Sequence, residues 1–405
     1  MMKKLRKLVS LTLVLALAVC MLAGCGSIAG SSTPAADAGT GSTAADNTDT
    51  PADSGKTVKI GVLVADVSGE EALGFADYYK NYITSNYNVE FSYTEQLADA
   101  AAEKAAIEKF AAQGFDAIIS FSASDRATQI ETCSANGLYY AVASGMLDDE
   151  QYEQYKNDEY FVGQIGPSMD TEYEAGYAMG KYFADQGVKS IAMYGAFIPN
   201  PMHVYRAAGV LAGIGATYGG ASDKDAIVGQ IFGDQGIDLS KVGAGSVEVV
   251  GYFQGFGDTT FDELFGCIGS QPEAFLSVGM ATTFFTDILN ENGIAFSDID
   301  SFTSANGTAM SEGKLVYLAG KYSSSVGPIF AAVMNAVNGT PVRNEDGSAL
   351  SISQNYLVAT DAASFDKYAS ADKGDSPIFN KEILDGIIGE VSAADFIACV
   401  EADRG

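Results

Sequence analysis

Short apolar runs alternate with longer amphipathic stretches once the chain has passed residue 57. The run Val58–Val64 (VKIGVLV) is rich in β-branched residues, which is typical of a strand that helices cover on both faces. Val89–Tyr93, Asp116–Phe121 and Leu138–Ser144 repeat this pattern, with helical periodicity in the intervals between them. This alternation predicts a parallel sheet built from right-handed βαβ units.

A polar exit follows the first predicted strand. Asp66 ends the apolar run, and Ser68-Gly-Glu-Glu71 matches a capping box that opens a helix, in which Ser68 and Glu71 satisfy each other's backbone N–H groups. Ligands of open α/β sheets bind beyond the carboxyl ends of the strands. We therefore expect Asp66 and Ser68 to lie near whatever the protein binds.

The strand–helix alternation starts again after the acidic, tyrosine-rich run 148–159. Further strands are predicted at Tyr160–Ile165, Val188–Tyr194, Val247–Phe253, Ala274–Val278, Ile299–Thr303, Leu315–Leu318 and Ser351–Ala359. Residues 219–246 are rich in glycine and poorly periodic, which suggests an insertion, and the carboxy-terminal part is predicted to be mainly helical. Two α/β halves of similar size result, and a chain of 405 residues suits two lobes better than one compact domain.

The amino terminus has the pattern of a lipoprotein signal peptide. A basic start (MMKKLRK) precedes the apolar segment Leu8–Val19, which is shorter than a membrane span. Leu22-Ala-Gly-Cys25 resembles the bacterial lipobox, which implies removal of residues 1–24 and diacylation of Cys25. Two acyl chains anchor a protein durably without a spanning helix. Residues 25–56 have few apolar side chains and are predicted to form a disordered stalk.

Composition argues against several classes of function. Lys+Arg 23 against Asp+Glu 52 gives a formal net charge of −29, and so acidic a surface repels nucleic acids and anionic lipid headgroups. Cys133, Cys267 and Cys399 remain after the signal and lipid-modified positions, an odd number without a CxxC pair, so no disulfide framework or zinc site is predicted. We expect no catalytic residue, no metal and no cofactor, and a secreted hydrolase is the least supported alternative.

Several segments, taken in order, resemble the type I periplasmic substrate-binding proteins of ABC importers. VKIGV stands at the first strand, AAEKAAIEKFAAQGFDAIISFSAS spans the second helix and third strand, and YFVGQIGPSMDTEYEAGYAMGKYFADQGVKSIAMYG precedes Arg206-Ala-Ala-Gly209. The resemblance covers about residues 57–365. It implies an α/β protein of two doubly wound, Rossmann-like parallel-sheet lobes, which a hinge of three crossings joins and which close on a ligand.

The same resemblance implies where the chain passes between the lobes. Crossings are expected near Ser144-Gly145, near Gly320-Lys321 and at residues 349–351. The amino-terminal lobe would then comprise residues 57–145 and 322–350, and the carboxy-terminal lobe residues 146–321 and 351–405.

Resemblance to the sugar-binding branch of this family implies polar contacts after the strands that face the cleft, and aromatic rings that stack on the sugar. Where that branch has an Asn-Asp pair and an aspartate, this chain has Ser277-Val-Gly-Met280 and Ser304-Ala-Asn306, and Lys321 stands in place of a glutamine. His203, the single histidine, either contacts the ligand or is a capping or solvent-exposed residue. The residues expected to contact the ligand are Asp66, Ser68, Ser122, Asp125, Ser144, Phe197, Asn200, His203, Arg206, Gln254, Phe256, Asn306 and Lys321.

These observations predict a lipid-anchored, extracytoplasmic, monomeric solute-binding subunit of an ABC importer. Its expected partners are a small polar solute, a sugar or sugar derivative first, a membrane permease, and the membrane through the lipid on Cys25. A nucleoside-binding protein of the basic-membrane-protein type is the alternative, because Val250–Asp258 resembles that branch in outline. A sensor that presents its closed form to a membrane receptor is a second alternative.

Overall fold

The structure is a computed structural model that describes residues 55–195, 200–255, 259–279, 281–374 and 376–402. The predicted signal peptide, Cys25 and nearly all of the predicted stalk lie outside the described residues, as do Phe197 and Phe256. Within the part that is described, no helix combines the length and the apolar character that a membrane crossing requires.

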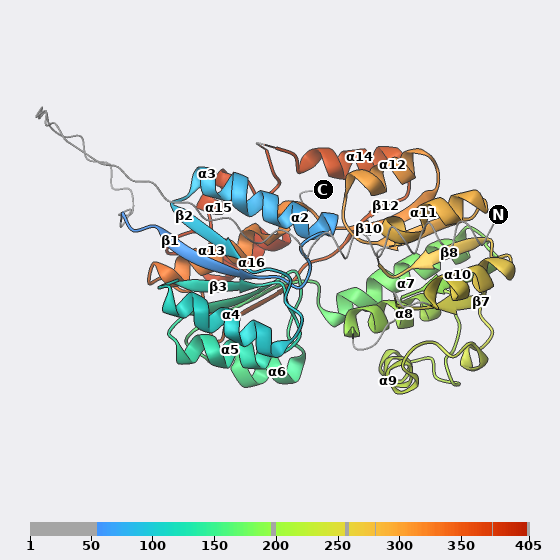
Figure 1. Ribbon diagram of the computed structural model, residues 1–405, viewed down its shortest axis with the longest axis horizontal. Coiled ribbons are helices and arrows are strands. Elements are labelled where there is room, and N and C mark those ends of the chain that lie inside the picture. The colour runs from blue at the N-terminus through green and yellow to red at the C-terminus, as the bar shows by residue number, and fades with distance from the viewer. Residues whose placement is uncertain (1–54, 196–199, 256–258, 280, 375, 403–405) are drawn as a thin grey trace, which may run out of the picture. The chain divides into compact units, whose positions relative to one another are not determined.

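The first sheet has six strands, all of them parallel, in the order β11-β5-β4-β3-β1-β2. Strands β1, β2 and β3 are labelled in Figure 1. The strands are β1 (Val58–Leu63), β2 (Val89–Tyr93), β3 (Ala117–Ser120), β4 (Tyr139–Ala143), β5 (Phe161–Gly166) and β11 (Leu350–Ser353). In β1, β3 and β5 nearly every residue is buried, as expected of strands with helices on both faces.

Helices cover both faces of the first sheet. The elements of this lobe are α2 (Glu70–Asp77), the π-helix η1 (Tyr78–Ile83), α3 (Thr84–Asn86), α4 (Ala100–Ala112), α5 (Arg126–Ala135), α6 (Asp149–Tyr155), α13 (Gly327–Val337), α15 (Lys381–Asp385) and α16 (Ala393–Glu401). One face packs against α2, η1, α13, α15 and α16, and the other against α4, α5 and α6. The sheet is therefore doubly wound, as predicted.

The second sheet also has six strands, in the order β12-β10-β9-β8-β6-β7. The strands are β6 (Ser190–Tyr194), β7 (Glu248–Phe253), β8 (Ala274–Ser277), β9 (Ala295–Ile299), β10 (Leu315–Gly320) and β12 (Leu357–Ala359). All neighbours are parallel except β10 and β12. The antiparallel β12 is an edge strand of this sheet. Along the chain it comes after β11, which belongs to the first sheet.

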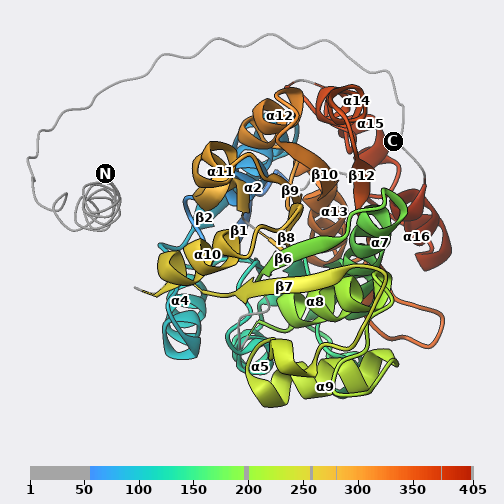
Figure 2. The same cartoon turned by 90° about the vertical axis from the view of Figure 1, so that its right-hand side faces the viewer.

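Helices again cover both faces of the second sheet (Figure 2). The elements are α7 (Met169–Asp185), α8 (Pro201–Gly213), α9 (Lys224–Asp234), the 3₁₀ helices η2 (Leu239–Lys241) and η3 (Ser323–Val326), α10 (Thr260–Gly269), α11 (Ala281–Glu291), α12 (Ser304–Ser311) and α14 (Ala362–Ala371). Of these, η3 follows the crossing that leaves β10 and packs on α2 and α13. The predicted insertion 219–246 contains α9, whose Ile227 and Ile231 are buried in the core beside α8.

The lobe boundaries expected from the resemblance are wrong at two places. Tyr140 of β4 pairs with Phe161 of β5, so residues 146–166 belong to the first sheet and the first crossing follows Gly166 rather than Ser144. Strand β11 pairs with β5 as far as Ser353, which moves the third crossing to residues 354–356. The acidic run 148–159 contains a helix of the first lobe, α6, instead of a connection between lobes.

The carboxy-terminal residues also differ from the expectation. Only α14 packs on the second sheet, through Phe365. A fourth connection then carries the chain back, and Leu384 of α15 and Phe396 of α16 join the core of the first lobe. Residues 376–402 were expected in the second lobe, but their apolar side chains are buried against the first.

Four glycines bring α7 and α8 of the second lobe unusually close together. A Cβ atom on Gly176 would lie 2.0 Å from the carbonyl oxygen of Arg206, and one on Gly209 would lie 2.0 Å from that of Tyr173. Gly180 and Gly213 face the same contact further along, at 2.4 and 2.3 Å from backbone oxygens. The two helix backbones therefore touch, and this contact places α8 side chains directly beside α7 side chains.

We predict that Gly176→Ala lowers the free energy of unfolding by about 1–3 kcal/mol, because the added methyl group forces the two helices apart. Gly229→Ala in α9 is the matched control: its Cβ would meet no atom within 4 Å, so the change should raise the stability by about 0.5–1 kcal/mol. Urea unfolding of both variants measures the difference. Equal effects of the two substitutions would contradict the close helix contact.

Candidate ligand pocket

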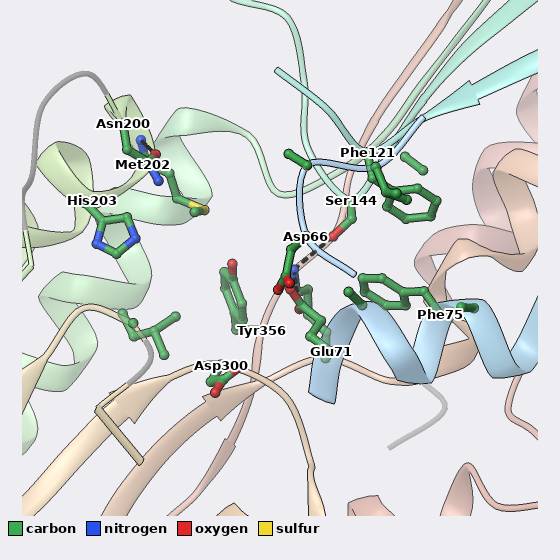
Figure 3. A pocket seen from close by; sticks show the side chains of 18 of the residues that line it. Asp66, Glu71, Phe75, Phe121, Ser144, Asn200, Met202, His203, Asp300 and Tyr356 are labelled. Carbon is green, nitrogen blue, oxygen red and sulfur yellow. Dashed lines mark hydrogen bonds and ion pairs between the residues drawn. The ribbon is translucent and has the colours of Figure 1, made fainter. Parts of the chain in front are cut away.

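A cavity of about 400 Å³ is lined by residues from both sheets and from two of the crossings. Val64 and Asp66 follow β1, Ser144 follows β4, and Asp300 follows β9. The start of α2 and the start of α8 contribute from opposite sides (Figure 3). The pocket thus lies beyond the carboxyl ends of strands in both sheets, where ligands of open α/β sheets bind.

The structure brings six of the thirteen expected contact residues to this pocket: Asp66, Ser144, Asn200, His203, Arg206 and Lys321. Five others do not line it: Ser68, Ser122, Asp125, Gln254 and Asn306. Phe197 and Phe256, which we expected to stack on the ligand, lie outside the described residues. Phe253, the neighbouring ring at a strand end, is buried in the core of the second lobe.

Three of the excluded residues instead shape the loops of the first lobe. Ser68 donates its backbone N–H and its hydroxyl to Oδ1 of Asp66. The Ser122 hydroxyl donates to the buried carboxylate of Glu103. Asp125 caps α5 by accepting from the Thr128 backbone N–H, and these bonds to Thr128 lower the pKa of Asp125.

The other two excluded residues support the second lobe. Gln254 accepts from the Tyr252 hydroxyl and donates to the carbonyl of Gln235, so it braces the loop after α9. Asn306 is fully buried and donates to the carbonyl of Ser301 at 2.8 Å. It lies behind the pocket wall, next to Asp300.

The capping box expected at the start of α2 is absent. Gly69 is the N-cap and has no side-chain cap, because the Asp66 carboxylate accepts the backbone N–H groups of Ser68 and Gly69. Glu71 is thereby free of a capping role. Its Oε1 lies 2.9 Å from Nζ of Lys321 and 2.9 Å from the Ser301 hydroxyl that donates to it.

Lys321 is a buried cation on the second crossing. It forms an ion pair with Glu71 and donates to the Ser144 hydroxyl at 3.0 Å. Burial alone would lower the lysine pKa, but the nearby carboxylate of Glu71 outweighs it and the pKa is raised. For Glu71, burial works in the opposite direction, and Lys321 holds the pKa of that carboxyl below its usual value. Both groups are therefore charged at neutral pH.

Arg206 is the second buried cation, and α7 supplies its counter-ion. Its Nε donates to Glu172 at 2.6 Å, Nη1 donates to the carbonyl of Val278 at 2.7 Å, and Nη2 donates to the Tyr356 hydroxyl at 2.6 Å. Tyr356 in turn donates to Glu172 at 3.1 Å. Tyr356 lies on the third crossing, so this network joins the second lobe to the hinge.

His203 and Asn200 sit at the start of α8. Asn200 caps the helix by accepting from the Met202 backbone N–H at 3.1 Å. The imidazole of His203 is 3% exposed, and burial together with the neighbouring Arg206 lowers its pKa well below the ordinary value. His203 therefore enters the pocket wall as a neutral ring.

Asp300 is a half-buried carboxyl in the pocket. Burial, followed by the negative charges of Asp298 and Glu71, raises its pKa to about 8. The sequence carried a signal for this residue, because Asp300 stands directly after a strand as Asp66 does. The sequence predicts this strand at Ile299–Thr303, with Asp300 inside it. That prediction is wrong, because β9 comprises Ala295–Ile299 and Asp300 follows it.

Aromatic side chains line the pocket on the side of the first lobe (Figure 3). Phe75 of α2 and Phe121 after β3 are stacked, with ring centroids 5.5 Å apart and planes inclined by 20°. Tyr93 at the end of β2 also lines the cavity, and burial raises the pKa of its hydroxyl. A pocket with rings on one wall and polar groups around it suits a small solute with a ring and hydroxyl groups.

No family model matches this sequence. No curated protein resembles it closely enough to be recognised as a relative. Among the described residues there is no group of three or more His, Cys, Asp or Glu side chains arranged to hold a metal ion.

The fold itself is shared with solved structures. A solute-binding protein of an ABC transporter from Bacillus halodurans C-125, with bound myo-inositol, is 16% identical and has a TM-score of 0.56, covering 78% of this chain and 98% of that one. The periplasmic component of the arabinose ABC transporter from Shewanella sp. ANA-3, bound to L-arabinofuranose, is 17% identical with a TM-score of 0.54, covering 77% and 95%. A transcription regulator from Chromobacterium violaceum is 13% identical with a TM-score of 0.52, covering 76% and 99%.

At sequence identities this low, the similarity to these structures shows a shared fold and does not show a shared function. The chain has the two-lobed α/β fold of the type I periplasmic binding proteins, and the predicted fold class is confirmed. Since both transporter subunits and a regulator use this fold, function has to be argued from the pocket.

We predict that Glu172→Gln lowers the free energy of unfolding by about 3–5 kcal/mol, because it leaves the buried Arg206 without its counter-ion. Glu174→Gln is the matched control, since Glu174 is exposed on the same helix. The double variant Glu172→Leu/Arg206→Met should be less damaging than Glu172→Gln alone. Chemical denaturation measures all three, and a loss below 1 kcal/mol for Glu172→Gln would show that the ion pair is not buried.

The raised pKa of Asp300 predicts a pH-dependent cost of folding. Between the ordinary value of 3.8 and about 8, the folded protein keeps a proton that the unfolded chain releases, so this group makes stability fall as pH rises over that window. Asp300→Asn removes the titration. Its stability relative to the wild type should therefore increase from pH 4 to pH 8 and then level off, as measured by urea unfolding at each pH.

The control for this series is Asp366→Asn, at an exposed position on α14. Its difference from the wild type should stay constant with pH. A constant difference for Asp300→Asn as well would refute a proton held on Asp300.

Proposed function

We propose that this protein is the extracytoplasmic solute-binding subunit of an ABC importer, anchored to the membrane by lipid on Cys25. The ligand would be a sugar or a sugar derivative, bound between the two lobes without chemical change. The observation that carries the proposal is the composition of the pocket. Side chains from both sheets and from two crossings line one cavity of sugar size, about 400 Å³, so a ligand in it would touch both lobes at once.

Binding would favour the closed arrangement because the ligand adds contacts that only closed lobes can make together. Asp66 and Ser144 would contribute from the first lobe, and Asn200 and Arg206 from the second. The ring of the solute would lie against Phe75 and its neighbours. A membrane permease would then recognise the closed form.

The ligand class is tested with the full-length protein purified in detergent. We expect thermal shifts with members of a panel of monosaccharides and polyols, and no shift with amino acids. Phe75→Ala should weaken the binding about tenfold or more by removing a stacking ring, whereas Asp225→Asn, at a side chain 87% exposed on α9, should leave it unchanged. A shift with nucleosides alone would select the alternative ligand, and no shift with either class would contradict the proposal.

The anchor has its own test. Cells that express the wild-type chain should incorporate labelled palmitate into the protein and retain it in the membrane fraction. Cys25→Ser should abolish the label and release the protein from the membrane. Retention of label in Cys25→Ser would refute the lipid anchor.

A further inference from the structure

Both cations in the pocket wall already have counter-ions. Arg206 is 4% exposed and pairs with Glu172 at 2.6 Å. Lys321 is 8% exposed and pairs with Glu71 at 2.9 Å. Arg206 also donates hydrogen bonds to the Val278 carbonyl and the Tyr356 hydroxyl. A ligand carboxylate or phosphate that approached either cation would have to compete with a buried glutamate, at a large cost in desolvation.

Two further carboxyl groups line the same cavity without a cation of their own. Within the described part of the chain, no basic side chain lies within 4.0 Å of Asp66 or Asp300. Asp66 is held by backbone N–H groups at the start of α2. The negative charges that act on Asp300 are those of Asp298 in β9 and Glu71 in α2. The pocket lining therefore has more carboxyl groups than cations, and a cation that reached Asp300 would interact with it in a region where burial strengthens electrostatic interactions.

The aromatic side chains of the pocket also favour positive charge. The Lys321 ammonium lies 5.8 Å from the ring centroid of Phe75 and 5.6 Å from that of Tyr356. These distances are typical of cation–π attraction, which extends to ligand cations on the open parts of the same rings. The faces that suit a sugar ring suit an attached ammonium group as well.

We infer that the pocket selects a solute that carries a positive charge, namely a sugar or a similar hydroxylated ring with a protonated amine, and that this amine binds at Asp300 and Asp66. The inference rests on the proposed function, and it names the ligand class of the same site. Anionic sugars such as uronates are excluded because both cations already pair with a glutamate, and neutral sugars bind more weakly because they offer the two carboxyl groups no cationic partner.

Binding of such a ligand displaces a proton. In the free protein Asp300 retains its proton to about pH 8, because burial and the charges of Asp298 and Glu71 disfavour the carboxylate. The other titratable groups that line the cavity are Asp66, the paired Glu71, Lys321 and Arg206, the neutral His203, and the hydroxyls of Tyr93 and Tyr356. An ammonium beside Asp300 stabilises its carboxylate, so the proton on the aspartate leaves to solvent while the amine keeps its own.

The experiment uses the full-length protein in detergent and sets of sugars that differ in one substituent. For the gluco, galacto and manno series, the parent hexose, the 2-amino-2-deoxy sugar, its N-acetyl derivative and the uronate are compared by calorimetry at pH 6. We expect the amine to bind about tenfold more tightly than its parent and its N-acetyl derivative in at least one series, and the uronates not to bind. Titrations in two buffers of different ionisation enthalpy should show release of close to one proton for the amine and none for the parent.

Two variants make the assignment specific. Asp300→Asn should abolish the preference for the amine and the proton release, and Asp66→Asn should reduce the preference. Asp225→Asn, remote on α9, should keep both. Equal or tighter binding of the neutral or anionic sugars, or binding of the amine without proton release, overturns the inference but leaves the proposed function standing. Failure of every sugar to bind refutes both.

Discussion

The architecture of the pocket depends on two buried cations that are each neutralised by one glutamate. An isolated charge at either place would cost several kcal/mol in lost hydration. Arg206 meets Glu172 because the glycines of α7 and α8 allow the helix backbones to touch. Lys321 meets Glu71 because Asp66 takes over the start of α2 and leaves that glutamate available. These pairs attach the second and third crossings to the lobes, through Lys321 and through Tyr356.

The alternation of strands and helices, and much of the pocket, could be predicted from the sequence for a simple physical reason. Parallel strands end at a common edge, so polar residues such as Asp66, Asn200 and Arg206 that follow strands gather there. The order of the strands in a sheet, by contrast, cannot be predicted from local periodicity. Phe161–Gly166 is a wholly buried run that fits either sheet equally well, and only its pairing with β4 assigns it to the first.

The residues that sequence reasoning missed owe their positions to contacts distant along the chain. Glu71 satisfies the local rules for a capping box, but its partners Ser301 and Lys321 are 230 or more residues away. Tyr356 falls inside the strand predicted at Ser351–Ala359, which the structure divides into β11 and β12 with the crossing between them. Its role follows from its contacts with Arg206 and Glu172. Lys321 departed from the residue expected in sugar-binding relatives, and the structure gives the departure a reason: it is balanced by Glu71.

The central claim is that a solute in this pocket draws the two lobes together. Spin labels at Lys104→Cys in α4 and Asp225→Cys in α9 would report the distance between the lobes by electron–electron double resonance. Cys133, Cys267 and Cys399 would be replaced by serine so that only the two new thiols are labelled. We predict that a sugar shown to bind by calorimetry shifts and narrows the distance distribution. An identical distribution with and without the bound sugar would contradict closure and the function built on it.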